Sequence, residues 1–330
     1  MNRGGILSKL IIRKLEKRHL PRALKLVREG YEEEKKKIPF LPEYQELAQG
    51  LQTNLKDLAE KGEGFVALED VDMIGFLAGY PVKQLFGSCR GVYVPLFGHG
   101  TQKNNRQEIY RELYTHAAEK WVEGGMFSHA LTFFAHDRET IDTWFWLGFG
   151  LRCVDSIRKT EEIEVSPSGL EVKKGKFSDL PMLASLHHNH RIYYRKSPVF
   201  MLKNFEDPLE DLEEWLSGEN HHFWYALDEG APVGYLQVEP AGETFISRHP
   251  SVMNITGAFV ADNIRGKGVG LALLARAQKW LKKEGYPLCG VDFESINITG
   301  SKFWNRYFTP YTFSLVRRID ERVGREKENA

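Results

Sequence analysis

Cysteine is scarce in this sequence. Its three cysteines, Cys89, Cys153 and Cys289, lie far apart and form no Cys-x-x-Cys pair. An odd number of scattered cysteines fits a reducing compartment better than a disulfide framework. We therefore expect a cytoplasmic protein.

The sequence also has no excess of one sign of charge and no long apolar run. The 45 Lys and Arg residues balance the 45 Asp and Glu residues, so the formal net charge is zero and no overall field attracts nucleic acid or an anionic membrane. No apolar run approaches the roughly 18 residues of a transmembrane helix. The opening GILSKLIIRKL is too short and too charged for the apolar part of a signal peptide. We expect neither nucleic acid nor a membrane as a partner.

An internal repeat dominates what is present. FVALEDVDMIGFL (Phe65–Leu77) and WYALDEGAPVGYL (Trp224–Leu236) share a strand, an acidic turn and a second strand. The same spacing relates Lys120-Trp121 to Lys279-Trp280, and it then grows by a single position, as shown by Gly125 with Gly285, Phe133 with Phe293, and Trp144 with Trp304. A shared spacing over such a length indicates a tandem duplication, although two unrelated units with similar hairpins would also fit.

The joint between the copies is expected in KTEEIEVSPSG (Lys159–Gly169), a polar stretch ending in Ser, Pro and Gly. We therefore predict two domains, 1–160 and 161–330, each large enough for its own core. Each half shows a strand, helices, a hairpin and then alternating strands and helices. In the second half this order runs from Leu170–Lys174 to Tyr311–Ile319. This order predicts an α+β fold with a mixed sheet.

The stretch RGKGVG, Arg265 to Gly270, follows a run of branched and aromatic residues and precedes a long helix-forming segment that we expect to end at Gly285. A glycine turn before a helix makes a phosphate cradle, because the first-turn N–H groups carry partial positive charge. Neither the G-x-G-x-x-G dinucleotide fingerprint nor a P-loop is present. The pattern that is met is Arg/Gln-x-x-Gly-x-Gly/Ala, and with it the second half resembles the acetyl-CoA-binding core of the GNAT N-acetyltransferase superfamily.

A second motif extends the resemblance. INITGSKFWNRYF (Ile296–Phe308) is similar to the family's N-x-x-small-x-x-F-Y signature. Specific motifs cover Asn254 to about Ile319. The resemblance implies that acetyl-CoA is the cofactor, with CoA as product. It implies that pantetheine enters a gap where strand four splays from strand five, beside the backbone of Ala258–Val260. The implied cofactor-binding residues are Phe259, Val260, Arg265, Gly266, Lys267, Gly268, Val269, Gly270, Asn297 and Phe303.

The first half departs from this pattern. Arg106 aligns with Arg265, but Gln107, Ile109 and Arg111 stand where the second half has its loop glycines. These side chains would occupy the space of a pyrophosphate. We expect domain 1–160 to keep a GNAT-like fold without an intact cofactor loop, and domain 161–330 to bind acetyl-CoA.

Acetyl transfer to an amine needs a base, an oxyanion donor and a proton for the leaving thiolate. Asp292 and Glu294 alternate on one face of a buried strand and are the candidate bases, although a solvated or paired face explains them equally well. The usual tyrosine of the family is replaced by Trp304, whose indole has no proton to give. Tyr307, one turn later, is the candidate acid, with direct protonation by water as the alternative.

Histidines at 187, 188, 190, 221 and 222 complete no metal-ligand set, and we predict surface or hydrogen-bonded roles and no metal. The run HHNHRIYYRKSPVF (His187–Phe200) falls where the family builds its acceptor pocket. Its tyrosines and arginines suit an anionic or aromatic acceptor, or else a packed helix end.

The function that these observations favour is an acetyl-CoA-dependent N-acetyltransferase acting on a primary amine of a small molecule or peptide. Three alternatives remain on the same fold: a mycothiol-synthase-like acyltransferase, a Fem-type peptidyltransferase, and a non-catalytic acyl-CoA sensor or scaffold. The neutral charge and the intact glycine motif argue against an aminoacyl-tRNA donor.

Overall fold

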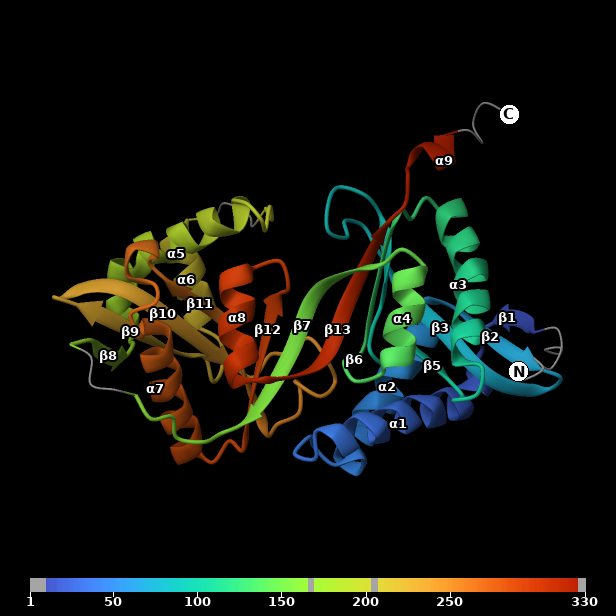
Figure 1. The fold of residues 1–330 in the computed structure, drawn as a ribbon, viewed down its shortest axis with the longest axis horizontal. Helices are drawn as coiled ribbons and strands as arrows, with labels where there is room; N and C mark the ends of the chain where they lie inside the picture. Colours follow the sequence, from blue (N-terminus) through green and yellow to red (C-terminus); the bar gives the residue numbers. More distant parts are fainter. Residues whose placement is uncertain (1–9, 166–168, 203–206, 326–330) are drawn as a thin grey trace, which may run out of the picture. The chain divides into compact units, whose positions relative to one another are not determined.

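The computed structural model describes residues 10–165, 169–202 and 207–325. They divide into two compact units, Met1–Val154 with Tyr311–Ala330, and Asp155–Pro310. Each unit is a mixed sheet covered by helices, which confirms the predicted α+β class (Figure 1).

The sheet of the first unit has the order β1-β2-β3-β4-β6-β13, and β5 also pairs with β3. The β4–β6 pair is parallel, whereas β6 and β13 are antiparallel. Its strands are β1 (Ile11–Lys14), β2 (Glu63–Glu69), β3 (Asp72–Val82), β4 (Gly91–Val94), β5 (His99–Thr101), β6 (Ser128–Phe134) and β13 (Thr309–Arg318). Its helices are α1 (Leu20–Lys37), α2 (Tyr44–Lys61), α3 (Arg106–Glu123), α4 (Arg138–Trp146) and α9 (Arg322–Arg325).

The sheet of the second unit has the order β7-β12-β11-β10-β9-β8. The β11–β12 pair is parallel, and the hairpin β9–β10 is antiparallel. Its strands are β7 (Gly150–Lys159), β8 (Glu171–Lys174), β9 (His222–Asp228), β10 (Ala231–Glu239), β11 (Val252–Val260) and β12 (Leu288–Glu294). Strand β7 belongs to this unit from Asp155 onward. Its helices are α5 (Leu180–Arg195), α6 (Pro208–Leu216), α7 (Val269–Glu284) and α8 (Ile298–Tyr307).

The repeat found in the sequence is present in the structure. The hairpin β2–β3 has its counterpart in β9–β10, and β6 has its counterpart in β12, at the spacings that the sequence repeat shows. Even the start of the following helix is repeated. Asp137 caps α4 by accepting a hydrogen bond from the N–H of Thr140, and Asn297 caps α8 by accepting one from the N–H of Gly300. The tandem organisation is confirmed.

The two compact units do not coincide with the continuous stretches 1–160 and 161–330. Strand β13, which the sequence analysis placed in the second domain, pairs with β6 from Thr312↔Phe134 to Arg318↔Ser128. Its Tyr311 and Leu315 are buried, and Leu315 belongs to the core cluster of the first unit. Strands β7 and β13 are equivalent copies, each the last strand of its repeat, so their sequence patterns could not tell which sheet each one joins.

Helix α7 shows how the second unit is held together. It buries Leu273, Leu274, Ala277 and Leu281 on one face, the spacing of an amphipathic helix, and packs against β9 and β10. The helix ends at Gly285, whose φ of +84° is the left-handed conformation that glycine adopts at low cost. The predicted end of this helix is confirmed.

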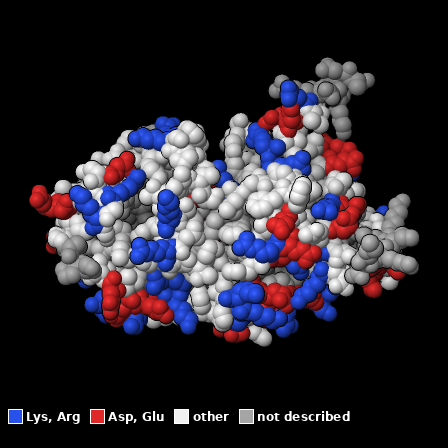
Figure 2. Space-filling view, viewed as in Figure 1, with Lys and Arg blue, Asp and Glu red and all other residues white. Residues whose placement is uncertain are grey.

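Charged side chains of both signs are interspersed on the face seen in Figure 2, in keeping with the net charge of zero. Within the described residues, no helix has the length and apolar character needed to cross a membrane.

The placement of β13 predicts which unit a core defect will affect. Leu315→Ala removes a side chain that is 1% exposed, and should cost about 2–5 kcal/mol of stability in the first unit. Hydrogen exchange followed by mass spectrometry should show faster exchange in 63–134, with 222–294 little changed. The half-buried neighbour serves as the control, and Val316→Ala should have a smaller effect. Faster exchange confined to 222–294 would contradict this placement of the strand.

Candidate active site

The opening between β11 and β12 is the first element of the candidate site. The two strands pair in parallel only from Val252↔Leu288 to Ile255↔Val291. Strand β11 then continues to Val260 and remains paired with β10, while β12 continues to Glu294. Beyond Ile255 the two strands therefore splay apart, as the family resemblance implied.

The glycine loop gives the site its second element. Gly266 and Gly268 have φ values of +81° and +87°, and a Cβ added at either would meet no atom within 4 Å. Their requirement for glycine is therefore conformational, and the space beside them is open. Gly268 is also the N-cap of α7. The first-turn N–H groups of this helix have no acceptor within the helix and form its electropositive end.

Arg265 lines the site in a fixed position. Its Nε donates a hydrogen bond to the backbone oxygen of Val260 at 3.0 Å, and its guanidinium pairs with Asp262 at 2.7 Å. The guanidinium carbon lies 4.6 Å from the centroid of the Tyr193 ring, within cation–π range. The arginine thus links the end of β11 to α5.

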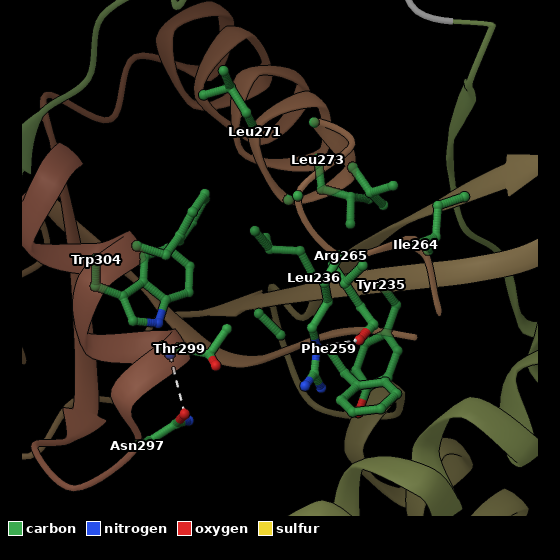
Figure 3. A pocket seen from close by; sticks show the side chains of 18 of the residues that line it. Tyr235, Leu236, Phe259, Ile264, Arg265, Leu271, Leu273, Asn297, Thr299 and Trp304 are labelled. Carbon is green, nitrogen blue, oxygen red and sulfur yellow. Dashed lines mark hydrogen bonds between the residues drawn. The ribbon is translucent and has the colours of Figure 1, made fainter. Parts of the chain in front are cut away.

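Asn297 joins two helices at the opposite wall. Its Oδ1 accepts hydrogen bonds from the N–H of Gly300 at 3.0 Å, drawn dashed in Figure 3, and from the hydroxyl of Tyr193 at 2.8 Å. The asparagine therefore caps α8 and also fixes a side chain of α5.

These elements enclose a cavity of about 400 Å³ within the second unit. Every predicted cofactor-binding residue lines it except Lys267. In Figure 3, Tyr235, Phe259 and Arg265 of β10, β11 and the glycine loop lie on one side of the cavity. Asn297, Thr299 and Trp304 of the α8 region lie on the other side, and Leu271 and Leu273 of α7 lie above.

The predicted catalytic residues do not all line the cavity. Tyr307 lines the cavity, as does Trp304 at the position of the family's usual tyrosine. Asp292 is exposed and Glu294 is half-buried at the end of β12, and neither is among the residues that line the cavity. The structure thus brings only one of the three predicted catalytic side chains, Tyr307, to the cavity wall.

A buried polar chain at the cavity escaped the sequence analysis. The hydroxyl of Tyr235 lies 2.8 Å from Nδ1 of His190 and 3.0 Å from Nδ1 of His187. Nε2 of His187 lies 3.1 Å from a carboxylate oxygen of Asp211, which also pairs with Arg191. Tyr235 is 1% exposed, and burial raises its pKa above the usual range, so it remains a neutral hydroxyl. His190 and Tyr235 both line the cavity.

The sequence did carry a signal for this chain. Phe76 occupies the position of Tyr235 in the first copy, so the two copies differ there by one hydroxyl. Helices α1 and α5 both begin with Leu-Pro, and in that alignment Val27 and Gly30 take the places of His187 and His190. A comparison of the buried positions of the two copies would have singled out the chain.

The corresponding region of the first unit is built differently. Helix α3 begins at Arg106, so Gln107 and Ile109 lie within the helix, whereas their counterparts Gly266 and Gly268 precede α7. Arg106 forms an ion pair with Asp137 at 2.7 Å. In the second unit the equivalent residues, Arg265 and Asn297, are both among those that line the cavity.

Comparison with known proteins identifies the second unit. Residues 186–299 match the model of the acetyltransferase (GNAT) family. This part of the chain is a GNAT domain. The match begins in α5 and ends in α8, so it spans the glycine loop and the splayed strands. A search of curated proteins finds no match to the sequence.

Solved structures extend the GNAT fold over both units. A GCN5-related N-acetyltransferase from Sphaerobacter thermophilus is similar over 94% of this chain and 95% of its own, with a TM-score of 0.60 and 13% identity. A GNAT acetyltransferase from Colwellia psychrerythraea is similar over 94% and 100%, with a TM-score of 0.50 and 11% identity. A glucosamine N-acetyltransferase region of a fungal multi-domain GH3 enzyme is similar over 94% of this chain and 38% of that one, with a TM-score of 0.55 and 13% identity.

The loop glycines should differ in their sensitivity to substitution. Gly268→Ala forces an L-residue into a left-handed conformation and should cost about 1–2 kcal/mol. At Gly270 the added methyl would lie 3.4 Å from the Phe303 ring, an ordinary contact, so Gly270→Ala should change stability by less than about 1 kcal/mol. Denaturant unfolding of the two variants measures the difference. Equal losses would show that the conformation of Gly268 is not what demands glycine there.

Proposed function

We propose that the second unit binds acetyl-CoA and transfers its acetyl group to a primary amine of a small molecule or peptide. The observation that carries the proposal is one cavity lined by the unpaired end of β11, the glycine loop and the first turn of α7. Each of these elements suits a different part of the same ligand.

The residues present fit acetyl-CoA, which supplies an activated acyl thioester when bound. The first-turn N–H groups of α7 and the permanent charge of Arg265 would hold the pyrophosphate, and the open space beside Gly266 and Gly268 leaves room for it. The cavity wall formed by β11 and α8 would hold pantetheine, with Phe303 and Val260 among its apolar contacts.

The backbone of β11 offers the donor that acyl transfer requires. In an antiparallel pair, alternate residues direct their N–H groups to the partner strand and the others to the opposite edge. Strand β11 pairs with β10 through Val260, whereas its edge toward β12 is open beyond Ile255. An N–H group between Ala258 and Val260 on that open edge would stabilise the developing oxyanion.

Acyl transfer also needs a proton donor for the sulfur and a base for the amine. Tyr307, on the cavity wall, would donate its hydroxyl proton to the leaving sulfur. Asp292 and Glu294 stay candidate bases from their position in β12, although both lie outside the lining of the cavity.

The first unit would not bind acetyl-CoA. Its counterpart of the glycine loop is the helical turn that contains Ile109, which is fully buried. The ion pair between Arg106 and Asp137 ties the start of α3 to the start of α4. Domain 1–160 is therefore proposed to be a GNAT-like copy with a structural role.

A second candidate function is acyl-CoA binding without turnover. Trp304 favours it, because an indole N–H at the position of the usual tyrosine cannot protonate a thiolate. A protein of this kind would bind acetyl-CoA, but no amine would accelerate the release of CoA.

Calorimetric titration tests the binding site directly. Wild-type protein should bind one equivalent of acetyl-CoA or CoA, and Gly270→Trp should bind none, because the indole projects between Phe303 and Val260. Arg111→Trp, at the equivalent position of the first unit, is the matched control and should bind like wild type. Two equivalents in wild type would mean that the first unit also binds, and no binding would refute the proposal.

The assignment of Tyr307 predicts a separation of turnover from binding. Tyr307→Phe should lower kcat by about 10²-fold or more while leaving the Kd for acetyl-CoA within a few-fold. The assay is thiol release with a panel of primary amines, and glucosamine belongs in that panel because the similar fungal region acetylates it. Unchanged turnover in this variant would remove Tyr307 from the mechanism.

A further inference from the structure

The hydrogen-bonded chain of Asp211, His187, Tyr235 and His190 permits a single arrangement of protons when both histidines are neutral. A carboxylate that accepts a hydrogen bond from Arg191 is ionised and can only accept, so Nε2 of His187 carries the proton that it donates to Asp211. Nδ1 of neutral His187 is then an acceptor, and it receives the hydroxyl proton of Tyr235.

The same reasoning fixes the second histidine. Once the Tyr235 hydroxyl donates to His187, its oxygen can only accept from Nδ1 of His190, 2.8 Å away. Neutral His190 therefore carries its proton on Nδ1, and its Nε2 is the basic nitrogen. Histidine tautomers are commonly set in this way by the hydrogen bond at the other ring nitrogen.

From this chain we infer that His190 is the general base that deprotonates the acceptor amine, with Tyr235, His187 and Asp211 as positioning residues. The inference rests on the proposed function. In the step, Nε2 of His190 takes one proton from the ammonium group of the acceptor, which leaves a neutral amine and an imidazolium. No bond of the existing chain is lost, because the imidazolium still donates Nδ1–H to Tyr235.

The position of His190 suits this role. Its ring lines the cavity and stacks on Phe259 of β11 with ring centroids 5.3 Å apart, beside the strand whose open edge offers the oxyanion donor. The hydrogen-bonded chain ends at the carboxylate of Asp211, which stabilises the positive charge that forms on His190 at the other end. Among the described residues, the titratable and charged groups near His190 include His187, Arg191 and Tyr194 of α5, Asp211 of α6, Tyr235 of β10 and Arg265 beyond Phe259.

The first unit provides an internal comparison. It has the same hairpin and helix, but Phe76 replaces Tyr235, and Val27 and Gly30 replace the two histidines. The polar chain is thus present in the copy that has the glycine loop, and three of its four members are absent from the copy that lacks it. A chain required only to hold this fold together would not show that difference.

The tautomer of His190 is measurable without turnover. Long-range ¹H–¹⁵N NMR of the histidine-labelled protein bound to CoA should show neutral His190 protonated on Nδ1, the less common form in solution. Tyr235→Phe removes the acceptor and should shift His190 toward the Nε2–H form. A wild-type His190 protonated on Nε2 overturns the inference.

The kinetic test compares two nucleophiles. An alkyl amine is protonated at neutral pH and needs a base, whereas hydroxylamine is already unprotonated and does not. His190→Gln should lower kcat/KM for the best alkyl amine of the panel by about 10²- to 10⁴-fold and should affect hydroxylamine far less. His116→Gln, a half-buried histidine of the first unit that does not line the cavity, is the matched control and should leave both rates unchanged.

The outcomes separate the inference from the proposed function. If His190→Gln binds CoA like wild type and both nucleophiles slow equally, the histidine has a structural role and the inference is wrong. If wild type binds no acetyl-CoA, the proposed function fails, while the NMR tautomer still decides the proton arrangement. Tyr235→Phe and Asp211→Asn should lower turnover of the alkyl amine less than His190→Gln does, since they keep the base and lose only its support.

Discussion

The site depends on one interruption of backbone pairing. Strands β11 and β12 stop pairing after Ile255 and Val291, while β11 keeps its other partner, β10. Unpaired backbone groups within a protein need other partners, so an open edge beside a cavity is ready to bind a ligand. The glycine loop, the first turn of α7 and the cap of α8 all contribute to the cavity next to that opening. A fully paired β11 would leave no room for a pantetheine arm.

The duplication allows one fold to be compared with itself. The two copies share strand spacing and helix caps, which are the features that packing and backbone hydrogen bonding require. They differ where polar groups are buried. A tyrosine hydroxyl costs stability in a core unless it is hydrogen-bonded, so Phe76 is the more stable choice where Val27 and Gly30 replace the two histidines. Tyr235 keeps its hydroxyl because two imidazole nitrogens lie within hydrogen-bond distance, one as acceptor and one as donor. The buried polar chain is therefore a difference between two copies of a common scaffold, as expected if it serves the proposed reaction.

Trp304 stands where the GNAT family usually has a tyrosine, so the proposed reaction would lack the usual proton donor at this position. The indole packs edge-on against Phe303 with ring centroids 4.8 Å apart and fills the wall where a tyrosine would present a hydroxyl. In the proposed reaction, the proton for the leaving thiolate would then come from Tyr307 or from water. Placing the base on α5, as inferred for His190, would put the two proton transfers on different elements of the cavity wall, α5 and α8.

The sequence by itself determined the α+β class, the repeat, the glycine loop and a set of candidate residues that, Lys267 excepted, line the cavity, because these rest on local patterns: hydrophobic spacing, turn chemistry and a short motif. Only the tertiary structure decided that β13 belongs to the sheet of the first unit, since β7 and β13 carry equivalent patterns and pairing is a long-range choice. The same holds for the chain of Asp211, His187, Tyr235 and His190, whose members come from α5, α6 and β10. Alternation in β12 suggested Asp292 and Glu294 as bases, whereas only the structure could tell that neither residue is among those that line the cavity. Hydrogen bonds between residues distant in the sequence leave no local pattern, so the fold had to bring these side chains together before their chemistry could be recognised.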